Sequence, residues 1–206
     1  MPDIRYISLE EAAQLIQQAP DGDTKINMQQ HLDAFAEFVE DGTSRIALYE
    51  GNTVLPYLAV KDDLIIVNGN LTVTGTLEDC LEVNLSLLLV FGNVTTQHLF
   101  TFSQICITGD LTVKDILVAD SICISSLDVQ GDVRARMIFE DGHWFDIKGT
   151  ITADNIYASH SKKPRGVLQS NLEDEDLPDE LKEKGKLDLS NLMQALMNNN
   201  ADFLKV

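Results

Sequence analysis

The side chains that could do chemistry lie scattered along this chain. The four histidines, His31, His98, His143 and His160, form no HxxxH or HExxH arrangement. Zinc sites built on one element present their ligands at such short spacings, so the sequence predicts no metal site. The sequence also contains no GxSxG, GxGxxG or P-loop motif, which mark hydrolases, dinucleotide-binding proteins and phosphate-binding loops. We therefore expect neither an enzyme nor a bound cofactor.

The three cysteines, Cys80, Cys106 and Cys123, are odd in number and have no CxxC spacing, which argues against a disulfide framework. Cys106 and Cys123 each lie between two isoleucines, where a thiol acts as a small apolar side chain that fills space. Adjacent acids such as Asp62-Asp63 face opposite sides of a strand and make a poor acid/base pair. These residues predict packing rather than catalysis.

Two acidic stretches are our candidates for contact with another protein. The first surrounds the only tryptophan, and its candidate residues are Glu140, Asp141, His143 and Trp144. Large aromatic side chains supply much of the binding energy of interfaces, which makes Trp144 a candidate anchor. The alternative is that Trp144 only seals the edge of a coil. The second stretch is the charge run Glu173, Asp174, Glu175 and Asp176.

A sequence motif is repeated five times between residues 64 and 157, and it must form the scaffold that positions the candidate side chains. In each copy, apolar residues lie four and two positions before a glycine and two and four positions after it. The glycines are Gly69, Gly92, Gly109, Gly131 and Gly149. Of the 20 residues at these positions only Thr96 is polar, and a period of two indicates strands with one buried face.

The intervals between these glycines run from 17 to 23 residues and vary too much for a leucine-rich repeat. They favour a parallel β-solenoid of about five coils, since turns can lengthen without disturbing stacked strands. We expect each glycine to form a corner that a Cβ would obstruct, with the Asn or Asp that usually follows satisfying backbone amides. A second apolar pair, seven and eight residues after each glycine, predicts another wall of the same core. The extra segments 81–85 and 122–124 predict either third strands or bulges.

Amphipathic helices are predicted on both sides of the repeat. Ser8 begins a capping box that predicts a helix over residues 9–19, and apolar residues from Met28 to Val39 at steps of three and four predict a second helix that ends at Asp41-Gly42. Because repeat arrays need polar ends, we expect this pair to cover the open first coil. A third helix, behind Asp188 or Ser190, is expected to cap the far end, with partner binding as the alternative.

The predicted fold is therefore mainly β, a parallel β-solenoid (β-helix) with helical N-terminal and C-terminal caps. Residues 45–50 and 54–60 predict strands that lead into the solenoid or form an irregular first coil. The predicted domains are a helical cap with lead-in strands over 1–60, the β-solenoid over 61–160, and a linker with the C-terminal amphipathic helix over 161–206.

The composition is strongly acidic, with 33 acidic against 15 basic side chains and a formal net charge of −18. Such a field repels nucleic acid and anionic membranes and attracts basic proteins. The alternative is that the charge serves solubility alone. No apolar run approaches the roughly 20 residues of a membrane helix, and the N-terminus lacks the pattern of a secretory signal. We therefore expect a cytoplasmic protein.

The glycine motif, written as Val67-Asn68-Gly69-Asn70-Leu71-Thr72-Val73 and again from Ile147 to Ala153, resembles the coils of bactofilins. These are bacterial cytoskeletal β-solenoids that polymerise end to end, and the resemblance covers roughly residues 64–158. It implies a homo-oligomer, although bactofilins have a bare solenoid whereas helices are predicted here at both ends, and covered ends cannot stack.

By type and charge the chain is also similar to the immunity proteins of bacterial polymorphic toxin systems. We therefore predict a non-enzymatic acidic binding protein, an immunity protein that neutralises a basic toxin domain. The alternative is a bactofilin-like scaffold that self-associates, and a third hypothesis is an enzyme of unknown type.

Overall fold

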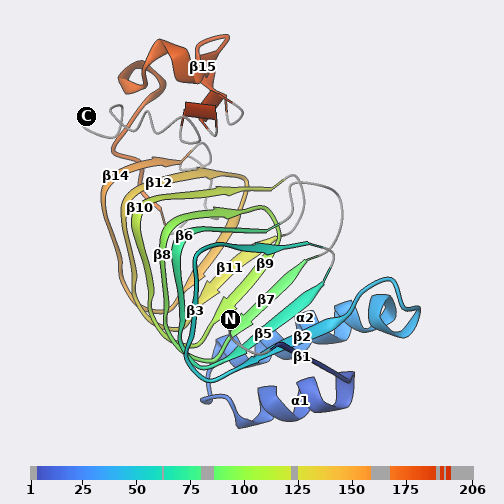
Figure 1. Ribbon diagram of the computed structural model, residues 1–206. Helices are drawn as coiled ribbons and strands as arrows, with labels where there is room; N and C mark the ends of the chain where they lie inside the picture. The colour runs from blue at the N-terminus through green and yellow to red at the C-terminus, as the bar shows by residue number, and fades with distance from the viewer. Residues whose placement is uncertain are drawn as a thin grey trace.

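The computed structural model describes residues 4–61, 63–79, 86–121, 125–158, 168–188, 191–192 and 194–195. Over these residues the chain is mainly β and winds into a parallel β-solenoid of about six turns, accompanied by two α-helices (Figure 1). The turn beyond the five predicted ones is formed by residues 46–60, which pair in parallel with the turn that follows.

Two sheets face each other across the interior. The first sheet contains, in spatial order, β1 (Ile4–Ile7), β2 (Ile46–Glu50), β5 (Leu64–Asn68), β7 (Leu87–Val90), β9 (Gln104–Ile107), β11 (Ser126–Val129) and β13 (Trp144–Ile147). The second contains β3 (Thr53–Leu55) and β4 (Leu58–Val60), then β6 (Leu71–Asp79), β8 (Val94–Thr101), β10 (Leu111–Asp120), β12 (Val133–Asp141) and β14 (Ile151–Ala158). All pairs within these sheets are parallel except β1 with β2.

The register confirms the predicted interior rows. Val67, Val90, Ile107, Val129 and Ile147 occupy one column of the first sheet, each paired with its neighbour in the next turn. The column lies within one continuous apolar cluster that runs the length of the solenoid and includes almost all of the predicted inward residues. Burial of these aliphatic side chains is the main source of stability, at about 1.5–3 kcal/mol for each fully buried one.

Only one member of the second apolar pair after each glycine forms the predicted wall of the same core. Leu99 and Ile138 point into the interior, whereas the next residues, Phe100 and Phe139, lie in a separate cluster on the outer face of the second sheet. The pair is continuous with a strand, and neighbouring side chains on a strand face opposite sides. Both faces of this half of the second sheet are therefore buried.

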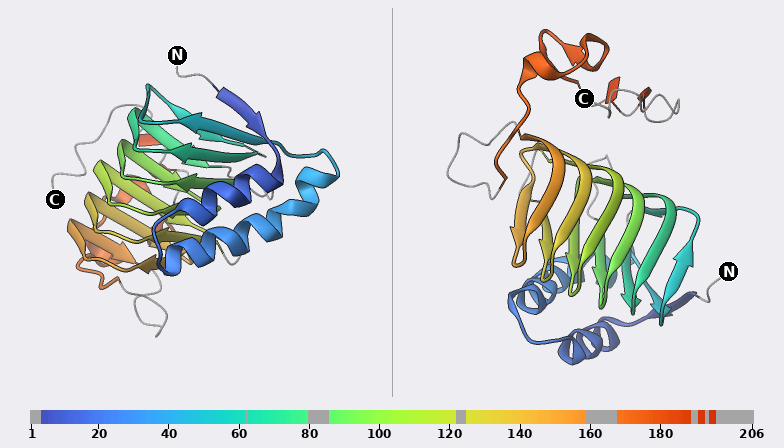
Figure 2. Two further views of the ribbon diagram at one scale, coloured as in Figure 1. Left: turned by 90° about the horizontal axis from the view of Figure 1, so that it is seen from below. Right: turned by 90° about the vertical axis from the view of Figure 1, so that its left-hand side faces the viewer.

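The helix α1 (Leu9–Gln18) forms where it was predicted, and the Ser8 hydroxyl accepts the N-cap hydrogen bond from the Glu11 amide at 3.2 Å. The second helix, α2 (Asp23–Glu40), begins five residues before its predicted start at Met28. The two helices form a helical hairpin, residues 9–41, that lies across the outer face of the first sheet (Figure 2). The prediction that they cover the first coil is wrong. The outer face of that sheet is itself apolar in the early turns, where Leu48, Ile66 and Leu89 pack in one cluster with the hairpin.

The C-terminal segment, meaning the described residues from 168 onward, contains η1 (Asp174–Asp176), η2 (Asp179–Leu181), β15 (Lys182–Glu183) and β16 (Lys186–Leu187). Leu168 packs against the interior cluster of the solenoid, whereas the later leucines, Leu172, Leu177, Leu181, Leu187 and Leu192, pack on the outer face of the second sheet. Residues 170–172 hydrogen-bond to the free edge of β14, with the Asn171 amide 2.9 Å from the carbonyl oxygen of Ile156. The Asp188 carboxylate accepts from the Asn191 amide at 2.8 Å, as expected for the start of the predicted third helix.

Several predicted features lie outside the described residues, namely segments 81–85 and 122–124, the linker at 159–167, and most of the third helix. No helix among the described residues is long and apolar enough to cross a membrane.

Candidate functional site

The first group of predicted partner-binding residues does not present a single surface. Trp144 begins β13 with 45% of its surface exposed, and Asp141 is also exposed at the end of β12. Glu140 and His143, in contrast, are buried, and burial lowers the pKa of His143 to about 4. A partner could therefore contact Trp144 and Asp141 directly, whereas Glu140 and His143 belong to the structural core.

The second predicted group lies in η1 and just before it. Glu173, Glu175 and Asp176 are exposed, whereas Asp174 accepts a hydrogen bond from the Tyr157 hydroxyl at 2.7 Å. Burial and the nearby Asp174 carboxylate raise the pKa of Tyr157. This group is thus fixed over the outer face of the second sheet, while Trp144 belongs to the first sheet.

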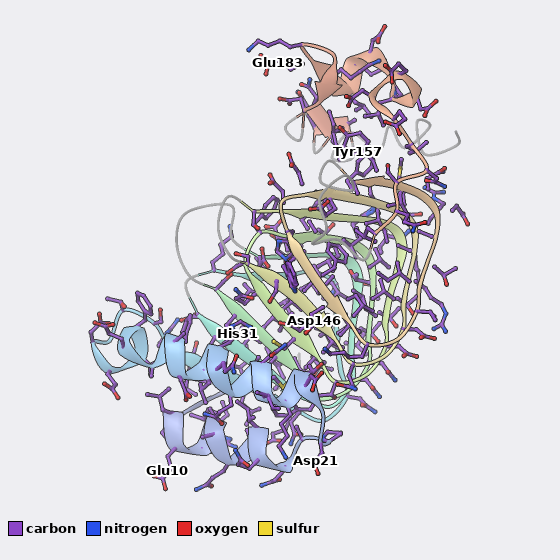
Figure 3. All side chains as sticks on the ribbon, turned by 180° about the vertical axis from the view of Figure 1, so that it is seen from behind. Glu10, Asp21, His31, Asp146, Tyr157 and Glu183 are labelled. Carbon is purple, nitrogen blue, oxygen red and sulfur yellow. The ribbon has the colours of Figure 1, made fainter. Side chains whose placement is uncertain are left out.

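A larger acidic surface lies on the helical hairpin. Residues 9–41 contain eight acidic side chains and one basic side chain. Seven of the acids are exposed, namely Glu10, Asp21, Asp23, Asp33, Glu37, Glu40 and Asp41. The one base, Lys25, donates to the Asp21 carboxylate at 3.0 Å and to the Gln17 carbonyl oxygen at 2.8 Å. The exposed side of the hairpin is therefore almost uniformly negative, and Figure 3 shows Glu10 and Asp21 at opposite ends of α1.

An apolar side chain lies within this acidic surface. Ile26, on the first turn of α2, is 57% exposed. It borders a shallow depression at the junction of the two helices, which is also lined by Gln17, Lys25 and Gln30. This surface was not predicted, because the two helices were expected at the end of the solenoid and not on the outer face of its first sheet.

A cluster of polar side chains lies beneath α2, and it was also missed. Asp128 on β11 is 2% exposed and accepts hydrogen bonds from Asn27 Nδ2 at 3.0 Å and from Ser126 Oγ at 2.8 Å. His31 Nε2 and Cys106 Sγ lie 3.4 Å and 3.5 Å from Asp128 Oδ2. Burial, followed by the nearby Asp128 carboxylate, raises the pKa of the Cys106 thiol well above its usual range.

The cluster extends to the next turn through β13. Asn27 Nδ2 also donates to Asp146 Oδ2 at 3.2 Å, and Lys148 Nζ lies 2.9 Å from both Asp146 and Asp23. Figure 3 shows α2, which carries His31, lying over the part of the first sheet that carries Asp146. These contacts join the N-terminal half of α2 to the last turns of the solenoid.

One column of the first sheet explains why the cluster forms here. Three positions before each glycine corner, the side chain faces outward toward the hairpin, and this position holds Ile66, Leu89, Cys106, Asp128 and Asp146 in successive turns. The column changes from apolar to polar along the solenoid. α2 changes in the same direction, because Phe35 and Leu32 face the early turns while Asn27 and His31 face the late ones.

This arrangement is unsuited to nucleophilic catalysis. In a catalytic triad the base lies between the nucleophile and the carboxylate, whereas here the Asp128 carboxylate lies between Cys106 and His31. Cys106 is also fully buried, and its raised pKa keeps the thiol protonated. Comparison of the chain with protein-family models, with curated proteins and with solved structures finds no match.

Proposed function

We propose that this protein is a non-enzymatic binding protein that recognises a basic protein domain, and that it acts as an immunity protein against a toxin. The observation that carries the proposal is the exposed side of the helical hairpin, with seven exposed acids and a single base that is already paired. Complementary charge accelerates association and rejects acidic competitors.

The same surface combines exposed charged residues with a central apolar side chain, as protein interfaces do. Exposed charges at a rim contribute little affinity, and most of the binding energy comes from a few apolar or aromatic side chains near the centre. Ile26 supplies such a side chain beside the depression at the junction of the helices. A basic partner would place an apolar side chain of its own against Ile26 and surround it with lysines or arginines.

The hairpin is also held rigidly enough to bind without reorganising. Ala12 and Ile16 of α1 and Met28, Leu32 and Phe35 of α2 are buried against the first sheet. Polar contacts from Asn27 and Lys148 hold its other end. A surface fixed in advance loses little conformational entropy on binding, which favours high affinity.

The alternative function, a self-associating scaffold, has less support. Parallel stacking of coils from end to end needs open strand edges at both ends. At the N-terminal end β1 pairs with β2 in the antiparallel sense, and at the C-terminal end residues 170–172 bind the edge of β14. These contacts cover one of the two sheets at each end, while β13 ends the first sheet and β3 and β4 end the second, and the partial cover opposes stacking of a whole further coil.

A coexpression experiment tests the proposal. The experiment uses a gene next to this one only if it encodes a large secreted protein with a basic C-terminal domain, and that domain is then the candidate toxin. We expect coexpression to rescue the growth of cells that produce this domain, and the purified pair to bind with an affinity that falls as salt concentration rises. Failure of both rescue and binding would overturn the immunity function.

Matched charge reversals locate the surface. Glu37→Lys with Glu40→Lys changes the hairpin, whereas Glu173→Lys with Glu175→Lys makes the same change of charge on the C-terminal segment. All four side chains are exposed, so both double variants should fold. We expect the hairpin variant to reduce the association rate at least tenfold and the C-terminal variant to change it little. The opposite result would move the interface to the Glu173 to Asp176 run.

A further inference from the structure

Three potential metal ligands from three separate elements meet beneath α2. His31 comes from α2, Cys106 from β9 and Asp128 from β11. Their ligand atoms, Nε2, Sγ and a carboxylate oxygen, all lie within 4.8 Å of one another. Imidazole, thiolate and carboxylate together form a donor set that zinc accepts, whereas calcium and magnesium take oxygen ligands.

Two of the three separations fit ligands that share one ion, and the third, from His31 Nε2 to Cys106 Sγ, is at most 4.8 Å, so a small movement of a side chain would complete the site. Zinc bonds of about 2.0–2.3 Å in a tetrahedron place neighbouring ligand atoms about 3.3–3.6 Å apart. The observed separations are 3.4 Å from His31 Nε2 to Asp128 Oδ2 and 3.5 Å from Cys106 Sγ to the same oxygen. The first is longer than an ordinary hydrogen bond between nitrogen and oxygen, which rarely exceeds about 3.2 Å. We propose that His31, Cys106 and Asp128 bind a zinc ion.

Neighbouring side chains prepare the carboxylate for this role. Asn27 Nδ2 donates to Asp128 Oδ1 at 3.0 Å and Ser126 Oγ donates to Asp128 Oδ2 at 2.8 Å, so the group is oriented from two sides. Such outer contacts typically fix the geometry of metal ligands. Asp146, one turn further along, adds a second carboxylate near the site, and Lys148 lies against that one rather than against Asp128.

Zinc binding would release the proton of Cys106. The reaction is the exchange of the thiol proton for the metal ion: the S–H bond breaks, a Zn–S bond forms, and the proton passes to solvent. Water would complete a fourth position, because three protein ligands leave one site of a tetrahedron open. The His31 side chain is 24% exposed, so the site borders solvent and an ion can enter without unfolding of the hairpin.

The ion would fasten the helical hairpin to the solenoid. Its ligands are separated in sequence by 75 residues (31 to 106) and 22 residues (106 to 128). A bond network across such separations stabilises the folded state over the unfolded chain, which holds no preformed site. The zinc site does not depend on the proposed partner, since none of its three ligands lies on the exposed side of the hairpin.

The test is titration of the purified full chain with Co²⁺ and then with Zn²⁺. Tetrahedral Co²⁺ with a thiolate ligand gives visible d–d bands and a near-ultraviolet charge-transfer band. We expect both to appear at one equivalent and to disappear when Zn²⁺ displaces Co²⁺. Calorimetry in two buffers should show release of about one proton per zinc, and saturating zinc should raise the Tm by roughly 5–10 °C.

Variants separate this site from any other zinc-binding group. Cys106→Ala and His31→Ala should each weaken zinc binding by at least tenfold, and Cys106→Ala should abolish the charge-transfer band. The matched control is Asp33→Asn, which removes an exposed carboxylate from the same helix as His31 and should leave binding within about threefold. Replacement of Cys80 and Cys123 by serine, with Cys106 retained, should leave the charge-transfer band in place.

His31→Ala keeps the experiment decisive if Cys106→Ala fails to fold, because the His31 side chain is 24% exposed whereas Cys106 is fully buried, so the loss of His31 should cost less stability. The proposal is overturned if the folded wild-type chain binds no zinc at micromolar concentration. It is equally overturned if both ligand variants bind zinc as tightly as the wild type, in which case Cys106 only fills space in the apolar cluster around it.

Discussion

Each coil turns twice, and the two corners are built on different principles. At the glycine corner the chain passes from the first sheet to the second, and each turn repeats the same contacts. Asn70, Asn93, Asp110 and Asp132 accept hydrogen bonds from the backbone amide of the equivalent residue in the next turn, at 2.8–2.9 Å. The result is a ladder of side chains on the solvent-facing edge of the solenoid.

At the return corner, where the chain passes from the second sheet back to the first, no such ladder repeats among the described residues. The connections differ in length from turn to turn, and individual buried polar groups hold them. Asp79 accepts from the Thr101 hydroxyl at 2.7 Å and from the Ser103 amide at 3.2 Å, and burial raises its pKa to about 6. His143 is buried at the same corner three turns later.

The difference shows where the repeat is constrained. The glycine corner has no room for variation, because each turn's backbone rests directly on the turn before. The return corner has room for inserted residues, so the polar groups buried there differ from turn to turn. Each of them costs stability if its hydrogen-bond partner is lost. The stability lost on substitution at the return corner should therefore depend strongly on which polar group is removed. The stability lost on substitution of a corner glycine should be similar in every turn.

Among substitutions at the two corners, Asp79→Ala should cause the largest loss of stability. The variant would leave the Thr101 hydroxyl and the amides of Phe102 and Ser103 buried without their acceptor. We expect a loss of about 3–5 kcal/mol in the free energy of unfolding, measured by urea denaturation at pH 7. Asp79→Asn, which keeps one acceptor oxygen, should lose less. Equal stability of Asp79→Ala and the wild type would show that the return corner does not need this carboxylate.

Gly131→Ala should come next. A Cβ at this position would lie 2.2 Å from Asp110 Oδ1 and 2.7 Å from the Gly109 carbonyl oxygen, and the second atom belongs to the backbone of the preceding turn. We expect a loss of about 2–3 kcal/mol by urea denaturation, from overpacking. The control is Gly42→Ala, where nothing lies within 4 Å and only the positive φ of 79° opposes a side chain. That control should lose about 1 kcal/mol, and a larger loss there than at Gly131 would contradict the steric account.

The return corner should also be sensitive to pH. Burial lowers the pKa of His143 to about 4, below the ordinary value near 6.5, so the unfolded chain binds this proton first. Stability is therefore lost as pH falls from 6.5 toward 4. Asp79, with its pKa raised to about 6, acts in the opposite sense, since its stabilising proton is lost as pH rises from about 4 through 6.

Removing His143 should reveal the pH dependence of stability that Asp79 contributes. Between pH 7 and pH 5 the wild type should change little, because the two effects offset each other. His143→Gln should become more stable relative to its own value at pH 7, by about 1–2 kcal/mol on acidification to pH 5. Urea denaturation at both pH values measures this, and a parallel pH dependence of wild type and variant would refute the assignment to His143.

Asn93→Ala should have the smallest effect. Its carboxamide oxygen accepts from the Asp110 amide at 2.8 Å on an exposed edge, where water can replace it. We expect a loss of about 0.5–1 kcal/mol, and a smaller loss for Asn93→Asp, which keeps the acceptor. A loss as large as that of Asp79→Ala would mean that the glycine-corner ladder, rather than the glycine itself, fixes the stacking.

Much of the fold could be predicted from the sequence, but little of the site. The glycines and the residues that follow them were recognisable because their contacts recur at every turn. Ser8 marked the start of α1 because capping is local. The position of the hairpin could not be predicted. The sequence pattern of an amphipathic helix shows that the helix has an apolar face, but it does not identify the surface on which that face packs.

The amino-acid sequence by itself determined the stacked interior and the glycine corners of this protein. Alternation along a strand and the lack of room for a Cβ act between residues that are close in the chain or equivalent in the repeat. Only the tertiary structure decided which outward faces are covered, and so brought His31, Cys106 and Asp128 together under α2. These three residues are close because distant parts of the chain bury apolar surface against each other. Such long-range packing leaves no local pattern in the sequence.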